Sequence, residues 1–214
     1  MRRHLKQQAL QPVFFAPLTQ DAIDIVSGNT GVITGANSPL YTAEGIHFRG
    51  SSVASGVQFI DWNYGDHQVP SPSLSQSMTF LCDLKNDNSS GHNAVLVFQK
   101  NTSSRFVSLI YSNRRWAAEK IGSGNVVAQL SQGISINTWY NNSGFCWDAD
   151  ERKLHLILNG QIVATQLVSS LPDFSNAQIR LGWADASADY FKGYLRNVRF
   201  YDRVFAPEMN LKHI

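Results

Sequence analysis

The sequence contains little charge, only two cysteines and no long apolar run. Charged residues make up 16% of the 214 residues and the formal net charge is +2, which gives no concentrated basic face for nucleic acid. No run of about 18 apolar residues is present to span a membrane. Residues 1–12 combine Arg2, Arg3 and Lys6 with glutamines where a signal peptide has its apolar core. We therefore expect no nucleic-acid partner, no membrane insertion and no signal peptide, and we interpret residues 1–12 as an N-terminal arm.

The two cysteines exclude a disulfide framework and a cysteine-based metal site. Cys82 and Cys146 are too few for a framework, and neither stands in a Cys-x-x-Cys or Cys-His spacing. Both lie within apolar, strand-like runs, where cysteine usually behaves as a small buried hydrophobe. We predict two buried thiols, and a single bridge between them remains the alternative.

Short apolar runs separated by turn residues dominate what the sequence does contain. Hydrophobic residues make up 43% and aromatic residues 11%, enough to bury a sizeable core. Helical periodicity is nearly absent, whereas runs rich in Val, Ile, Phe, Thr and Trp recur between clusters of Gly, Ser, Asn and Asp. This pattern predicts an all-β protein, a two-sheet antiparallel β-sandwich.

The boundaries of the predicted elements follow from where these runs begin and end. Strands are predicted at residues 45–48, 57–62, 77–85, 94–100, 105–112, 115–121, 126–130, 138–148, 153–158, 161–168, 177–183 and 193–201. Loops are predicted at residues 28–39, 68–75 and 86–93, and a short helix or turn at 207–213.

The clearest local signal is a three-stranded meander near the middle of the second half of the chain. Leu154, Leu156 and Leu158 alternate on one face and are followed by Asn159-Gly160, a pair that favours a type I′ hairpin turn. A second turn, at residues 148–152, connects this hairpin to the preceding strand. That preceding strand contains two tryptophans, Trp139 and Trp147.

Several segments in a fixed order carry a resemblance to a known family. They are Asp24-Ile-Val-Ser-Gly-Asn-Thr-Gly, Gly45-Ile-His-Phe-Arg-Gly, Leu156-Ile-Leu-Asn-Gly-Gln-Ile-Val and Phe191-Lys-Gly-Tyr-Leu-Arg-Asn-Val-Arg-Phe-Tyr. With their spacing they resemble the laminin-G-like group of the concanavalin A-like lectin and glucanase superfamily. The resemblance implies a concanavalin A-like jelly roll over residues 13–214, after the arm at 1–12. The family pattern has apolar bulk at Trp139 and Trp147, so the resemblance implies that both lie in the core. The pair Asn141-Asn142 departs from the family pattern, which usually has histidine or apolar residues there.

Some members of that superfamily hydrolyse glycans, which requires two carboxylates projecting from one face of a strand. No predicted strand of this chain carries such a pair. The nearest carboxylates, Asp148, Asp150 and Glu151, fall in a predicted turn, where we interpret them as solvated side chains. We therefore expect a protein that is not an enzyme.

The resemblance also implies a calcium ion at the rim of the sandwich. Asp61, Asn63 and Asp66 offer oxygen ligands at close spacing, as calcium requires. The alternative interpretation of these residues is a simple polar turn. No other cofactor is expected.

Sugar binding usually needs an exposed aromatic ring beside groups that form hydrogen bonds. Five aromatic residues at strand ends or beside loops are candidates for this role, and packing in the core or at the rim is the alternative for each. They are Trp62, Tyr64, Trp116, Trp183 and Tyr190.

A sandwich without a signal peptide or a disulfide framework resembles accessory structural proteins of tailed bacteriophages. The leading hypothesis is therefore a non-enzymatic virion protein, either a capsid decoration protein or a tail-associated adhesion module. It would be made in the host cytoplasm, bind capsid or tail proteins and, as the resemblance implies, form a trimer. The first alternative is a lectin that binds cell-surface glycans, and the second is a glycoside hydrolase. Fold alone does not decide among them.

Overall fold

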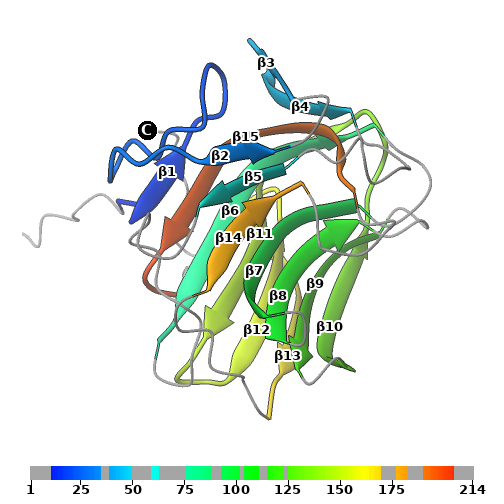
Figure 1. The fold of residues 1–214 in the computed structure, drawn as a ribbon. Helices are drawn as coiled ribbons and strands as arrows, with labels where there is room; N and C mark the ends of the chain where they lie inside the picture. Colours follow the sequence, from blue (N-terminus) through cyan, green and yellow to red (C-terminus); the bar gives the residue numbers. More distant parts are fainter. Residues whose placement is uncertain are drawn as a thin grey trace, which may run out of the picture.

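The computed structural model describes residues 11–34, 39–49, 59–62, 76–87, 93–101, 104–110, 115–122, 125–169, 177–182 and 190–204. All the regular secondary structure in these residues is β-strand, arranged as two antiparallel sheets that face each other (Figure 1). The all-β sandwich prediction is therefore confirmed. None of the described residues forms a helix that is long and apolar enough to cross a membrane.

The larger, eight-stranded sheet contains the first and last strands of the described chain. β1 (Phe14–Ala16) pairs antiparallel with residues 198–200 of β15 (Lys192–Tyr201). The remaining order is β13 (Gln161–Leu167), β12 (Lys153–Leu158), β11 (Trp139–Asp148), β6 (Met78–Asn86), β15, β4 (Gly45–Arg49) and β3 (Leu40–Thr42).

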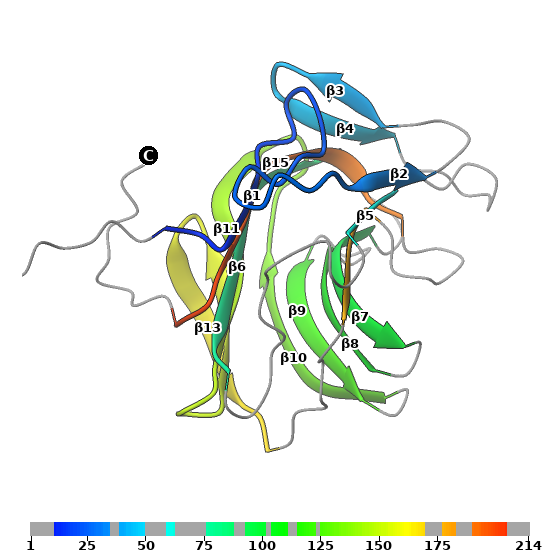
Figure 2. The same ribbon diagram turned by 60° about the vertical axis from the view of Figure 1, so that its left-hand side comes forward.

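The second, seven-stranded sheet is curved and faces the first, as Figure 2 shows. Its order is β10 (Asn125–Gly133), β9 (Arg115–Gly122), β8 (Ser104–Ile110), β7 (Asn93–Asn101), β14 (Gln178–Leu181), β5 (Phe59–Trp62) and β2 (Val32–Thr34).

Each predicted strand corresponds to an observed strand, but three observed strands lie outside the predicted ranges. β1 precedes them all, β2 lies inside the segment predicted as a loop, 28–39, and β3 follows it. Each has only three residues, too few for alternation to be visible in a sequence. Residues 1–10 of the predicted arm, the loop at 68–75 and the element at 207–213 lie outside the described residues, so these remain predictions.

The core between the sheets consists of apolar side chains from alternate positions of both sheets. Phe80 and Phe145 of the larger sheet and Trp62 of the smaller one have no exposed surface. Phe14 of β1 meets Trp62 edge-on, with ring centroids 5.2 Å apart at 87°, so this contact joins the two sheets. Trp147 is also fully buried, which confirms its predicted place in the core.

The predicted meander is confirmed, including the positive φ values of its Asn159-Gly160 turn. Asn159 and Gly160 have φ values of 51° and 75°, the positive values that a type I′ turn requires. At the other turn, Asp148 Oδ1 accepts hydrogen bonds from the backbone N–H groups of Asp150 and Glu151, both at 3.0 Å. Asp148 is thus mostly buried and holds the turn, which corrects the expectation that its carboxylate is solvated.

Both cysteines are buried and free, so the bridge that the sequence left open does not form. Cys82 belongs to the core between the sheets, whereas Cys146 packs in a second apolar cluster with Leu81, Ile157 and Tyr201. Burial raises the pKa of the Cys82 thiol well above its usual range, which keeps the thiol protonated and unreactive.

Candidate binding face on the eight-stranded sheet

A β-bulge in β11 decides which face of the larger sheet each tryptophan of that strand takes. In the β11–β6 ladder Tyr140 is opposite Leu84 and Ser143 is opposite Cys82, so two residues stand where one is expected. One of them, Asn142, has a φ of 49°, a left-handed conformation that asparagine tolerates better than most residues.

Trp139 and Trp147 are an even number of residues apart, so an unbroken strand would place them on the same face. The extra residue reverses the alternation. Trp147 points into the core, whereas Trp139 lies opposite Lys85 on the outer face and is partly exposed. The prediction that Trp139 is a core residue was therefore wrong, because the bulge places its side chain on the outer face.

A second bulge lies on the other side of β6, in β15. Arg196 is opposite Asp83 and Arg199 is opposite Leu81, again with one residue more than regular pairing allows. Asn197 within this bulge has a φ of 52°. The two bulges therefore flank the same part of β6 from both neighbouring strands.

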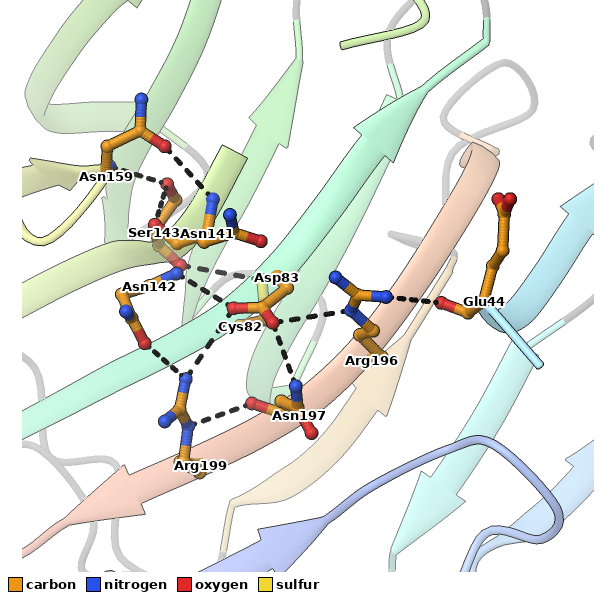
Figure 3. A network of polar contacts seen from close by, with 10 residues as sticks. All are labelled: Glu44, Cys82, Asp83, Asn141, Asn142, Ser143, Asn159, Arg196, Asn197 and Arg199. Atoms are coloured by element: carbon orange, nitrogen blue, oxygen red, sulfur yellow. Dashed lines mark hydrogen bonds and ion pairs between the residues drawn. The ribbon is translucent and has the colours of Figure 1, made fainter. Parts of the chain in front are cut away.

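Asp83 of β6 connects these two bulges through a network of polar contacts (Figure 3). Its Oδ1 accepts the backbone N–H of Asn142 at 2.9 Å, and its Oδ2 accepts Nδ2 of Asn197 at 2.8 Å. Arg196 Nε lies 3.4 Å from Oδ2, and Arg199 Nη2 lies 3.7 Å from Oδ1. The Asp83 side chain is only 5% exposed, so these donors compensate a charge that is almost removed from water.

Next to this network, four side chains form a cross-strand row on the outer face, which we call the aromatic row. It runs from His47 of β4 through Tyr194 of β15 and Lys85 of β6 to Trp139 of β11. The rings of His47 and Tyr194 are stacked, with centroids 4.2 Å apart at 3°. The Lys85 ammonium lies 4.1 Å from the centroid of Tyr194, and the Arg196 guanidinium lies 4.1 Å from that of Trp139. At these distances each cation is attracted to the ring that it contacts, by a cation–π interaction.

Two carboxylates complete the charge pattern around the aromatic row. Glu44, in the turn between β3 and β4, places its Oε2 2.8 Å from Lys85 Nζ, and this hydrogen bond lowers the pKa of Glu44. Asp87 Oδ2 lies 3.4 Å from His47 Nε2. Burial nevertheless outweighs that carboxylate and lowers the pKa of His47, so the ring is neutral at neutral pH.

Of the five predicted sugar-binding aromatics, Trp62 and Tyr190 have side chains that the structure describes. Trp62 has no exposed surface and packs in the core, and Tyr190 is 8% exposed, so neither ring offers a face to a ligand, and both predictions are corrected. Trp116 is in β9, but its side chain is not among those that the structure describes, and Tyr64 and Trp183 lie outside the described residues. Trp139 was not among the predicted binding residues. The signal in the sequence that could have identified it is the Asn141-Asn142 pair, which forms the β11 bulge.

The structure gives Asp61, one of the three predicted calcium ligands, a different partner. Its two oxygens accept hydrogen bonds from Arg180 Nε at 2.7 Å and Nη2 at 3.0 Å, and Gln178 Nε2 adds a third at 3.1 Å. Asn63 and Asp66 lie outside the described residues. Within the described part of the chain, no three His, Cys, Asp or Glu side chains come together as a metal site. The calcium site therefore remains a prediction.

The jelly-roll sandwich, with a core between two sheets and a polar, aromatic outer face, defines a concanavalin A-like domain. A family model described as the Concanavalin A-like lectin/glucanases superfamily, of the laminin-G type, matches residues 61–209. The chain belongs to this superfamily. A search of curated proteins finds no match.

Solved structures support the same fold at low sequence identity. Domain 4 of AbnA, an extracellular arabinanase of Geobacillus stearothermophilus, in complex with arabinotriose, has a TM-score of 0.67 at 18% identity, covering 94% of this chain and 96% of that one. The CBM40 of the Ruminococcus gnavus IT-sialidase, bound to α2,3 sialyllactose, has 0.53 at 16%, covering 62% and 79%. The botulinum neurotoxin serotype D binding domain has 0.65 at 13%, covering 92% of this chain and 49% of that domain.

Proposed function

We propose that this protein is a non-catalytic carbohydrate-binding module and that the outer face of its eight-stranded sheet binds the glycan. The observation that carries the proposal is the position of Trp139. A bulge turns this large ring out of the core, where an uninterrupted strand would have placed it, and leaves it partly exposed among charged groups.

Trp139 is the ring of the aromatic row that best suits stacking on a sugar. Tyr194 is held on one side by the stacked ring of His47 and on the other by the Lys85 ammonium, because β4 and β6 flank β15. Trp139 stands at the end of the row, 6.3 Å from Tyr194 between ring centroids, with the Arg196 guanidinium 4.1 Å from its own centroid. A sugar would stack on the ring face opposite this guanidinium, and Arg196 supplies hydrogen-bond donors next to the ring.

The structural relatives support a binding role over the other hypotheses. Two of the similar structures contain a bound oligosaccharide, and a third is a toxin binding domain. Nothing in the family match or in these structures points to a virion protein, a capsid or tail partner, or a trimer. We therefore propose the lectin alternative in place of the virion hypothesis.

The test is a glycan-binding screen with neutral and acidic polysaccharides on the wild type and on Trp139→Ala. We expect binding to at least one glycan and a loss of roughly five- to tenfold in Trp139→Ala, since an aromatic contact contributes about 1 kcal/mol. Leu167→Ala is the control, because it removes an exposed apolar side chain from the edge strand β13 of the same sheet. Binding that is unchanged in Trp139→Ala, or no binding to any glycan, would overturn the proposal.

A further inference from the structure

We infer, on the basis of the proposed glycan binding, that the ligand is an acidic glycan whose carboxylate or sulfate replaces Glu44 at the Lys85 ammonium. In the structure Glu44 occupies this position, with its Oε2 2.8 Å from Lys85 Nζ. The two side chains differ in exposure, at 58% for Glu44 and 17% for Lys85. The Lys85 side chain is therefore mostly buried in the surface of the sheet, whereas the Glu44 side chain is mostly exposed to solvent.

Glu44 can leave Lys85 without disturbing the turn that carries it. The turn is held by Thr42, whose Oγ1 donates to the backbone carbonyl of Gly45 at 2.7 Å and accepts the backbone N–H of Glu44 at 3.2 Å. Arg196 Nη1 also lies 3.4 Å from the Glu44 backbone carbonyl oxygen. None of these contacts uses the Glu44 carboxylate, so its displacement leaves the β3–β4 turn intact.

Lys85 cannot follow Glu44 into solvent as easily. Its ammonium lies 4.1 Å from the ring centroid of Tyr194 and 5.4 Å from that of Trp139, and the side chain is mostly buried along its length. A cation with few waters around it needs an anionic partner more than an exposed one does. The acidic group of a ligand can supply that partner next to the ring proposed to contact the sugar.

The neighbouring position on the same face also favours an anionic ligand. Arg49 of β4 and Lys192 of β15 are direct cross-strand partners, and both are exposed. They stand two residues from His47 and Tyr194, about 7 Å along the strands. Two cations side by side make the potential of this part of the face more positive, which favours the approach of an anionic polymer.

The chain provides a matched pair of variants for the test. Glu151, in the turn after β11, has the same 58% exposure and forms an ion pair with Lys153 at 2.6 Å. Glu44→Gln and Glu151→Gln therefore change the net charge equally, and each removes one ion pair between an exposed glutamate and a lysine. Only Glu44→Gln removes a competitor for the ligand, so we expect it to strengthen binding of polygalacturonate about threefold or more, whereas Glu151→Gln leaves it unchanged.

Titrations against polygalacturonate, a sulfated galactan, neutral galactan and single-stranded DNA complete the experiment. We expect tighter binding of the acidic glycans than of neutral galactan, with an affinity that falls as salt rises, and a loss of this preference in the Arg49→Gln/Lys192→Gln double variant. Equal binding of the neutral and acidic glycans, with Glu44→Gln behaving as Glu151→Gln, would overturn the acidic ligand while the proposed function stands. Binding of DNA as tight as that of polygalacturonate would overturn glycan specificity, and absence of binding to every glycan would overturn the proposed function itself.

Discussion

The two faces of the eight-stranded sheet differ in what places their side chains. On the inner face, Phe80, Phe145 and Phe200 are fully buried and pack against one another along neighbouring strands. On the outer face, the aromatic row and the Asp83 network depend on two bulges that interrupt the same strands. Alternation along each strand therefore specifies the inner face, whereas the positions at which that alternation breaks specify the outer face.

The largest expected effect comes from the inner face. Phe80→Ala should lower the free energy of unfolding by about 3–5 kcal/mol, because it leaves a cavity among rings with no exposed surface. Urea unfolding followed by fluorescence measures this loss. Phe15→Ala, at a partly exposed position of β1, serves as the control and should cost clearly less. If the two variants lose the same free energy of unfolding, then the packing of the inner face does not contribute more to stability than the partly exposed position of Phe15 does.

Removal of the link between the two bulges should have the next largest effect. Asp83→Ala removes the acceptor of the Asn142 backbone N–H and of Asn197 Nδ2, together with the negative charge next to Arg196 and Arg199. We expect a loss of about 2–4 kcal/mol. Because the bulges position Trp139, glycan binding should fall in the same variant. An Asp83→Ala protein with wild-type stability and binding would show that the network does not organise the outer face.

The backbone conformation of a bulge can be separated from its side-chain contacts. Asn142→Ala and Asn142→Gly both remove the 2.6 Å hydrogen bond from Arg199 Nη2 to Asn142 Oδ1. Only glycine accepts a φ of 49° without strain, so Asn142→Gly should be more stable than Asn142→Ala by about 1 kcal/mol. Thermal unfolding of the two variants gives this difference. If alanine is the better residue, then the left-handed conformation is not what this position requires.

The smallest expected effect is a dependence of stability on pH at His47. Burial lowers its pKa from the ordinary value of 6.5, so the unfolded chain takes up a proton at a higher pH than the folded protein does. The stability that this group contributes is therefore present above pH 6.5 and is lost as the pH falls below that value. Melting temperatures between pH 7.5 and 5 should fall less in His47→Gln than in the wild type. Parallel curves for the two proteins would show that His47 does not titrate in this way.

How much of the molecule could be predicted depends on whether a feature is local. The type I′ turn at Asn159-Gly160 was predicted because both positive φ values are required by two adjacent residues. The core position that the family pattern implied for Trp147 is confirmed, and the pairing of β11 is regular around this residue. Trp139 was assigned to the wrong face, although the Asn141-Asn142 pair had already distinguished this strand from the family pattern.

The sandwich, its longer strands, its Asn-Gly turn and the apolar side chains between the sheets follow from the amino-acid sequence, because period-two alternation and turn chemistry act over a few neighbouring residues. The candidate binding face, in contrast, forms only when distant strands pair. His47, Lys85, Trp139 and Tyr194 come from four strands that are far apart in the sequence. Their meeting depends on cross-strand register, and that register is shifted by bulges that a carboxylate from a third strand, Asp83, stabilises.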